Sequence, residues 1–368
     1  MTGRRSLAST LLLATATVCS ACSTPSPTVG PTPTSSLAAA TVLGTPSPAP
    51  TPTDTPEPTA SVTIAALDGM PANPTLANRL PIAVMIDDEV IARPQAGFNA
   101  ASIVYQAPAD GGEDRYMLIF QENDAPLVGP VRSGRPYFVR WAAEYRSLFA
   151  HYGGDAKTLA YIPTIDGSLI YNLDALAGSN AAFHRVSTRS APHNAYTSTA
   201  AMWRVGLTRG APAAMVAGLD LRRFAPDLAP TDRPSRGSIS IPYGEGTTSY
   251  TYDPSTNSYL RSVAGRPQVD AADGSRVIAR NVVVLFMALS IDPQSEPGHH
   301  RPVLAQIGTG AALVFNNGKV VVGKWSKANA GALTVFLATS GAEISLVPGR
   351  IFIQVVPIGT NVTYDAAR

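Results

Sequence analysis

Two arginines in the segment GPVRSGRPY, residues 129–137, flank a Ser-Gly turn directly before a predicted helix. Pro136 suits the first helical position, where its missing N–H costs nothing, and the neighbouring backbone N–H groups stay unpaired. Together with Arg132, Ser133 and Arg135, those groups would form a receptor for an anion or a carboxylate. The alternative is that the arginines pair with aspartates and hold loops together, and both roles can coexist.

Asp87 and Asp88 end an apolar run at residues 82–86 that is typical of a strand buried on both faces. Neighbouring carboxylates differ in pKa and can divide acid and base roles, and hard cations prefer oxygen ligands. Adjacent residues of a strand point to opposite faces, so only one aspartate faces a given site. We predict Asp87 as an acid or base and Asp88 as a ligand contact. A plain turn or cap, or an ion pair with an arginine of residues 129–137, is the alternative.

Two histidines lie next to turns or loops. His151 is in a predicted strand that runs into Gly153-Gly154-Asp155, and His193 is in the loop segment SAPHNAYTS. A neutral imidazole suits general base work. We predict His151 or His193 as the partner of Asp87, with structural hydrogen bonding as the alternative. No metal and no cofactor are predicted, because no spacing such as H-x-x-x-H is present. The other predicted ligand contacts are Asp110, Arg115, Asp155 and Asn194.

Strands and helices alternate around these residues, which predicts a layered α/β sheet for the first half of the folded body. Apolar side chains at i, i+3, i+4 and i+7 predict the helix over residues 136–146. In an open sheet, ligands bind at the carboxyl ends of the strands, where several candidate residues lie. Strands are predicted at residues 82–86, 103–105, 116–121 and 148–152, and helices near 95–101, over 136–146, after Asp155 and after Thr197 or Ser198.

The second half, from about residue 235, has short alternating strands and no helix of useful length. Asn317-Gly318 between two apolar runs is a strong hairpin signal. The pattern predicts an antiparallel β meander or small barrel, and the loop around His299-His300 is predicted to be solvated. We therefore predict an N-terminal α/β domain at residues 71–225 and a mainly antiparallel β domain at residues 235–362.

The N-terminus carries a secretory signal, with Arg4 and Arg5, a mostly apolar run at residues 7–18 and small residues before Cys22. The run is too short to span a bilayer, which needs about 20 apolar residues. Because Ser20-Ala21-Cys22 resembles a bacterial lipobox, residues 1–21 are predicted as a signal peptide and Cys22 as the lipidated residue. Plain secretion and a retained anchor are the alternatives.

Residues 22–70 are rich in Pro, Thr and Ser, and they are predicted to form a disordered tether that holds an extracytoplasmic body off the membrane. Removal of the signal peptide leaves 26 basic and 26 acidic residues, and this balance argues against nucleic acid as a partner. No G-x-S-x-G, P-loop or dinucleotide-binding motif is present. Thiol catalysis is excluded if the one remaining cysteine carries lipid.

Four motifs, PIAVMIDDEVIARPQAG, GPVRSGRPYF, HYGGD and APHNAYTS, together resemble the YerB-like bacterial lipoproteins of the DUF3048 type. The resemblance covers about residues 75–358 and implies a lipid anchor and two domains of unknown function, but it implies no reaction. This chain has Asp88 where the family is expected to have Asn. It has Gln106 and Asp110 where Glu is expected, and Asp155 where Ser is expected.

Two hypotheses about function follow. In the first, the chain binds a cell-envelope polymer, such as peptidoglycan or another glycan, and cleavage is a further option. Asp87 would be the acid or base, His151 or His193 its partner, and Arg132 and Arg135 the clamp on an anionic group. In the second, the chain is a non-catalytic envelope scaffold or binds another envelope protein. The predicted partners are thus a wall polymer or envelope protein, and the membrane through the N-terminal lipid.

Overall fold

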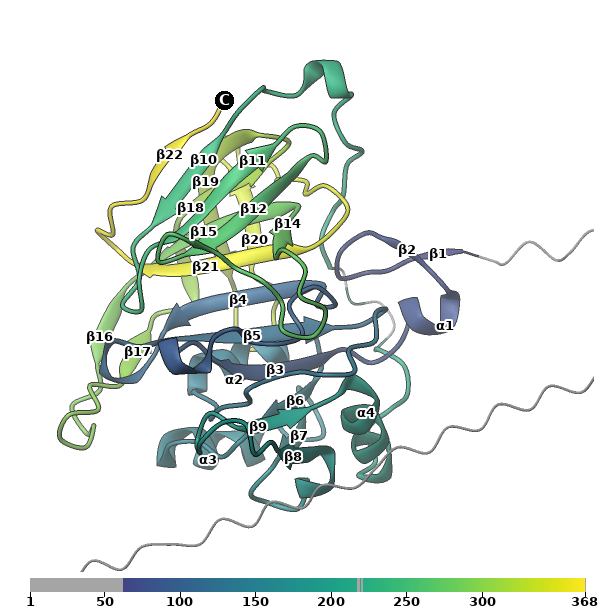
Figure 1. Cartoon of the computed structure of the whole chain (residues 1–368), viewed down its shortest axis with the longest axis vertical. Coiled ribbons are helices and arrows are strands. Elements are labelled where there is room, and N and C mark those ends of the chain that lie inside the picture. The colour runs from purple at the N-terminus through teal and green to yellow at the C-terminus, as the bar shows by residue number, and fades with distance from the viewer. Residues whose placement is uncertain (1–61, 217–218, 220, 368) are drawn as a thin grey trace, which may run out of the picture. The chain divides into compact units, whose positions relative to one another are not determined.

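One mixed sheet of ten strands runs through both halves of the chain (Figure 1). The computed structural model describes residues 62–367 except 217, 218 and 220, so the predicted signal peptide, Cys22 and most of the predicted tether lie outside the described residues. The first half supplies β3 (Ile82–Asp87), β4 (Ile103–Pro108), β5 (Asp114–Phe120), β6 (Leu148–His151) and β7 (Tyr171–Asp174). The second half supplies β15 (Asn281–Met287), β18 (Gly308–Asn316), β19 (Lys319–Lys327), β20 (Val335–Ala338) and β21 (Ile351–Pro357).

The two halves meet inside this sheet, whose order is β20-β19-β18-β15-β21-β4-β5-β3-β6-β7. β21 pairs in parallel with β15 on one side and with β4 on the other, where Ile351 stands opposite Ile103. All described residues accordingly belong to one compact unit. The predicted split into domains at residues 71–225 and 235–362 is not confirmed, because the sheet continues across the boundary.

A second sheet and helix α4 (Thr199–Thr208) cover one face of the large sheet. Tyr250 of the second sheet packs edge-on against Phe352 of β21, with ring centroids 6.0 Å apart. Gly206 of α4 lies so close to β6 that an added Cβ would stand 2.6 Å from Leu148 Cδ2. The second sheet contains β10 (Ser238–Ile241), β11 (Thr248–Asp253), β12 (Ser258–Val263), β13 (Arg266–Pro267), β14 (Ile278–Ala279) and β22 (Thr363–Asp365).

Helices α2 (Pro136–Ala143) and α3 (Ala156–Tyr161) belong to the other core, on the opposite face of the large sheet. Trp141 of α2 stacks on Tyr105 of β4, with ring centroids 5.1 Å apart. The predicted helix over residues 136–146 is confirmed as far as Ala143, and Pro136 is its first residue, as predicted.

Local cap and turn signals are confirmed. Asp155 caps α3 by accepting the backbone N–H of Thr158 at 3.0 Å, and Ser198 caps α4. Asn317-Gly318 joins β18 to β19 with both residues at positive φ, 51° and 69°. The strands of the second half are mainly antiparallel, as predicted, and the β15–β21 pair is a parallel exception.

The helix predicted near residues 95–101 is wrong. Gly97 has a φ of 105°, which lies outside the helical region. The carboxylate of Asp270 accepts the backbone N–H groups of Gly97 and Asn99 at 2.9 and 2.8 Å. A residue from the second half therefore holds this segment as a turn, which the local sequence does not reveal.

The folded body starts before residue 71, because β1 (Thr63–Ile64) pairs with β2 (Pro71–Ala72). The predicted tether at residues 22–70 is thus too long at its C-terminal end. No helix in the part of the chain that the structure describes is long and apolar enough to cross a membrane. The remaining elements are α1 (Pro74–Ala77), β8 (Phe183–Arg185), β9 (Ala195–Thr197), β16 (Leu289–Ile291), β17 (Pro302–Leu304) and 3₁₀ turns at Val90–Ala92, Asp110–Gly112, Ile162–Thr164, Asn180–Ala182 and Pro230–Asp232.

Candidate functional site

The end of β3 places the two predicted aspartates on opposite faces of the large sheet. Asp87 stands opposite Arg115 of β5 in the antiparallel register, so these two side chains share a face. Asp88 lies on the other face, where it contacts Arg93 at 3.0 Å and Gln106 at 3.0 Å. Both aspartates are buried. This geometry agrees with the prediction that only one of them faces the site.

Asp87, Glu89, Arg132 and His193 form a group that we call the acid–histidine cluster. His193 Nδ1 lies 2.8 Å from Asp87 Oδ2, and Arg132 Nε lies 3.2 Å from the same oxygen. Arg132 Nη2 donates to Glu89 Oε1 at 2.5 Å, and His193 Nε2 lies 3.7 Å from Glu89 Oε2. The side chain of Asp87 is 2% exposed, whereas those of Glu89, Arg132 and His193 are 24%, 18% and 12% exposed. The cluster thus joins a buried carboxylate to three groups at the surface.

Backbone contacts bring the members of this cluster together. Arg132 N donates to the carbonyl oxygen of Met85 on β3 at 3.0 Å. The His193 loop is anchored by Arg189, which donates to the carbonyl oxygens of Ile91 and Pro94 at 2.8 and 3.0 Å. The loop is therefore attached to the segment that directly follows Asp87 and Glu89.

A carboxylate bonded to His Nδ1 fixes the ring orientation and leaves Nε2 to exchange a proton, which is the arrangement of a general base. Oxygens of Asp87 and Glu89 and a nitrogen of His193 also lie within 4.8 Å of one another, as metal ligands would. Arg132 contacts both carboxylates, however, and its positive charge would oppose a cation there. The geometry therefore favours an ion-paired cluster over a metal centre.

The second arginine of the 129–137 segment is engaged differently. Arg135 makes a bidentate ion pair with Asp110, at 2.7 and 2.6 Å. Burial alone would raise the pKa of Asp110, but the hydrogen bonds and charge of Arg135 lower it. Ser133 Oγ accepts hydrogen bonds from Arg135 at 2.9 Å and from Arg115 at 3.1 Å. Arg135 and Ser133 therefore hold loops together, as the alternative from the sequence expects.

Arg115 is a buried guanidinium without a close carboxylate. Its side chain is 3% exposed, and the ion pair recorded for it, with Glu113, is long at 3.7 Å. Its Nε has no hydrogen-bond partner among the described residues. Burial and the charges of Arg135 and Arg132 lower its pKa to about 10. The buried charge of Arg115 would therefore gain from an anionic partner.

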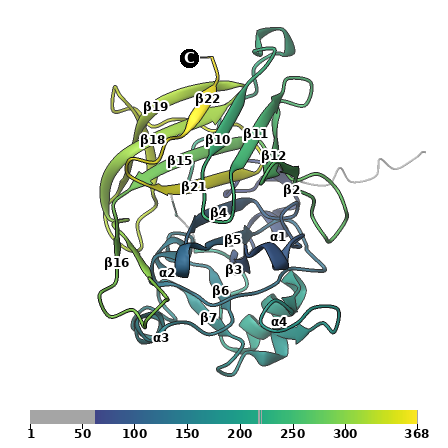
Figure 2. The same ribbon diagram turned by 60° about the vertical axis from the view of Figure 1, so that its left-hand side comes forward.

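The sequence missed Glu89 and Arg301. Arg301 lies at the end of the β16–β17 hairpin, which extends from the second half toward α3 (Figure 2), and its Nε is 3.4 Å from Asp110 Oδ2. His299 and His300 in the same loop are exposed, as predicted. The position of Glu89 directly after the aspartate pair is a signal that could have found it. Arg301 has no such local signal, because its contact is with the other half.

His151 has a structural role, in contrast to the predicted catalytic one. It is fully buried, with Nδ1 2.7 Å from the carbonyl oxygen of Gly153 and Nε2 2.8 Å from Asn172 Oδ1. Both ring nitrogens are thus occupied inside the fold. Asn194 donates to the carbonyl oxygen of Val186 at 3.3 Å and so holds the His193 loop. Asp155, besides capping α3, lies 3.7 Å from Arg135.

Asp88 belongs to a buried polar network that joins the two halves, and this contradicts its predicted role as a ligand contact. Gln106 Nε2 donates to Asp88 Oδ2 at 3.0 Å, and Gln106 Oε1 accepts from Arg261 of β12 at 2.6 Å. Arg261 is fully buried and donates to the hydroxyls of Tyr116 and Tyr250. Burial raises the pKa of Asp88 to about 6.

We expect Asp88 and Gln106 to tolerate an exchange of their chemical roles. In Asp88→Asn alone, the new side-chain NH₂ group faces the NH₂ group of Gln106, so two donors meet. This should cost about 1–3 kcal/mol of unfolding free energy. Gln106→Glu alone brings a second carboxylate to the buried Asp88. The double variant restores one donor and one acceptor, so it should recover most of the loss in urea denaturation. A loss equal to the sum of the single variants would contradict this pairing.

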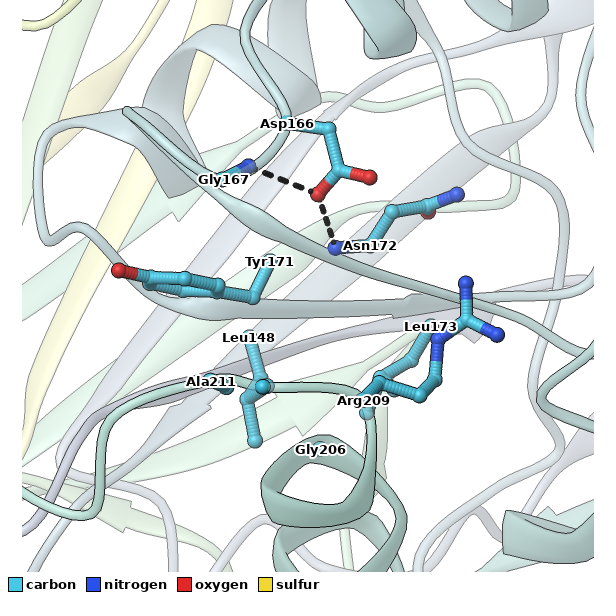
Figure 3. A pocket seen from close by; sticks show the side chains of 10 residues that line it. Leu148, Asp166, Gly167, Tyr171, Asn172, Leu173, Gly206, Arg209 and Ala211 are labelled. Carbon is cyan, nitrogen blue, oxygen red and sulfur yellow. Dashed lines mark hydrogen bonds between the residues drawn. The ribbon is translucent and has the colours of Figure 1, made fainter.

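A cavity of about 350 Å³ lies between β7 and α4 (Figure 3). Asp166 Oδ1 accepts the backbone N–H groups of Gly167 at 3.0 Å and Asn172 at 2.8 Å. Arg209 donates to the carbonyl oxygen of Gly178 at 3.1 Å. The polar groups of Asp166 and Arg209 thus bind backbone groups next to β7. None of the residues that line the cavity is a predicted site residue.

Comparisons with known proteins match both halves of the chain. Residues 67–211 match the family described as protein of unknown function (DUF3048), N-terminal domain, and residues 239–353 match its C-terminal domain. YerB of Bacillus subtilis (strain 168), named as a candidate lipoprotein, is 29% identical over 308 residues, which is 81% of this chain and 88% of YerB. The crystal structure of the Bacillus subtilis YerB protein is similar, with a TM-score of 0.72 and 25% identity, and covers 82% of this chain and 99% of its own.

Proposed function

Because the chain belongs to the YerB-like lipoprotein family with DUF3048 domains, we propose that it is an extracytoplasmic, lipid-anchored protein that binds a cell-envelope polymer. Cys22 would carry the lipid. The convergence of Asp87, Arg132 and His193 from three separate segments supports this proposal most strongly. They meet at a partly exposed position, beside a buried Arg115 without a close carboxylate.

Arg132, at the exposed side of the cluster, suits an anionic group. A carboxylate or phosphate on a wall glycan or its peptide would accept hydrogen bonds from Arg132. The charge of Arg115 would add attraction. Such a group competes with Glu89 for Arg132, which makes each contact weak. A polymer with repeated anionic groups offsets this weakness through multivalent binding.

Cleavage of the polymer is a second candidate function, favoured by the 2.8 Å contact between Asp87 and His193. With its Nδ1 proton held by Asp87, His193 would accept a proton from water at Nε2. The further alternative is a non-catalytic scaffold that binds another envelope protein, in which these ion pairs only hold loops in place.

Sedimentation of the purified full chain with isolated sacculi tests the proposal. We expect Arg132→Gln to weaken binding about tenfold, because it removes a charged hydrogen-bond donor. Arg204→Gln is the matched control, because Arg204 lies exposed on α4 without a recorded ion pair within the described chain. Soluble fragments released by the wild type would add cleavage to binding. If the wild type does not bind sacculi, both polymer binding and polymer cleavage are overturned, and the scaffold alternative remains.

A further inference from the structure

A cavity of about 550 Å³ lies between the segment after Glu89 and the turn that joins β12 to β13. Its volume falls in the range of about 300–1,000 Å³ that is usual for ligand sites. Residues of both halves line it, among them Val90, Gln95, Arg266, Gln268 and Val269. None of these belongs to the acid–histidine cluster.

Two buried glutamines line this cavity. One has a free side-chain NH₂ group, and the other has a free side-chain oxygen. Gln268 is 8% exposed, and its Oε1 accepts a hydrogen bond from Arg261. Because arginine can only donate, the Nε2 end of Gln268 is the free one, and no acceptor is recorded for it in the described chain. Gln95 is 1% exposed and donates through Nε2 to the carbonyl oxygen of Asp87 at 2.9 Å. Its Oε1 is therefore the free end and lacks a donor among the described residues.

The remaining lining is basic and apolar. Arg266 is exposed, and no ion pair is recorded for it within the residues described, whereas Arg93 is paired with Asp88 at 3.0 Å. Val90 and Val269 are 65% and 36% exposed. Val90, Gln95, Arg266, Gln268 and Val269 bring no carboxylate to the cavity. The charge of the cavity thus suits an acidic ligand with a small apolar part.

We propose that this cavity binds an acidic peptide. A peptide group supplies both a carbonyl oxygen for Gln268 Nε2 and an N–H for Gln95 Oε1. A carboxylate of the peptide pairs with Arg266, and small apolar side chains contact Val90 and Val269. Gln95 Oε1 is buried beside the cavity, so its contact with the peptide N–H requires a local rearrangement, which the amide signal of Gln95 would report on binding. The site does not depend on the proposed function of the acid–histidine cluster.

Titration of the full chain with N-acetyl-Ala-Glu-Ala-amide, followed by NMR, tests this site. The control peptide has Gln in place of Glu. We expect saturable binding of the acidic peptide, about tenfold weaker binding of the Gln peptide, and a similar loss in Arg266→Gln. Arg204→Gln, with the same change of charge on α4, should bind like the wild type. The side-chain amide signals of Gln95 and Gln268 should shift on binding.

Three outcomes would overturn the proposal: no saturable binding, equal binding of both peptides, or full affinity in Arg266→Gln. Because Arg266 is exposed, its replacement is not expected to unfold the chain. Val269→Glu places a negative charge in the lining and should also weaken binding of the acidic peptide. Arg132→Gln should leave peptide binding intact, so failure of this site is distinguishable from failure of sacculus binding.

Discussion

Lys327→Met is expected to lower the free energy of unfolding by about 3–5 kcal/mol. Lys327 Nζ lies 2.8 Å from Glu144 Oε1, and both side chains are 0% exposed. Glu144 also accepts from the backbone N–H of Thr334 at 3.0 Å and from its hydroxyl at 2.6 Å. Methionine fills much of the same space but removes the one cation that forms an ion pair with buried Glu144 among the described residues. Because Glu144 ends α2 and Lys327 ends β19, the variant also weakens the contact between the two halves.

Guanidinium denaturation followed by tryptophan fluorescence measures this loss. Lys324→Met is the matched control, because Lys324 is exposed on the same strand and its replacement should change stability by less than about 0.5 kcal/mol. Adding Glu144→Gln to Lys327→Met removes the unpaired charge and keeps an acceptor for Thr334, so it should restore most of the stability. A loss for Lys327→Met no larger than the control would refute the buried pair.

Asp87→Asn is expected to weaken sacculus binding at least about tenfold, because Asp87 holds Arg132, at 3.2 Å, in the position from which it meets the polymer. Where fragments are released, the variant should slow their release by about 10²-fold or more. The amide keeps an acceptor for the backbone N–H of Glu89, now 3.1 Å from Asp87 Oδ1. It carries no charge for Arg132, and it presents a donor to His193 Nδ1, which moves the ring proton to Nε2. The imidazole then no longer accepts a proton at its exposed side.

The fold should survive this substitution. Arg132 keeps its 2.5 Å contact with Glu89, so the cost should be about 1–2 kcal/mol, which shifts the melting temperature by only a few degrees. Arg132→Gln should reduce binding by a similar factor, because it removes the other charge of the same contact. A combined variant whose loss is smaller than the sum of the two would show that the residues act together.

The sequence predicts those parts of the site that follow from local geometry. Adjacent residues of a strand face opposite ways, so the division between Asp87 and Asp88 follows from β3 alone. Pro136 marks the start of α2 because it has no N–H to leave unpaired. Asp155 marks the start of α3 because its side chain accepts a backbone N–H of the first turn. These signals need no knowledge of distant contacts, and the structure agrees with them.

Other parts depend on contacts between distant segments. The sequence places His151 in a strand and His193 in a loop, but this does not decide which of them pairs with Asp87. β7 excludes His151, because its Asn172 occupies the second ring nitrogen. Likewise, Arg115 faces Asp87 only because β5 pairs with β3 in one particular register.

The sequence also did not reveal that the two halves share one sheet. β21 reads as an apolar strand buried on both faces, IFIQVVP, and such a strand fits the centre of a sheet. Its partner β4 lies far away in sequence, so the pattern gives the burial of β21 but not its neighbour. For the same reason, no local motif predicts the contact of Arg301 with Asp110.

The most direct test of the account is a paired measurement on Asp87→Asn, its affinity for sacculi and its melting temperature against the wild type. The account predicts a large loss of affinity with a melting temperature within a few degrees of the wild type. Unchanged affinity in a folded variant would contradict a role for the acid–histidine cluster in binding. A collapse of the melting temperature would show that Asp87 serves the fold alone.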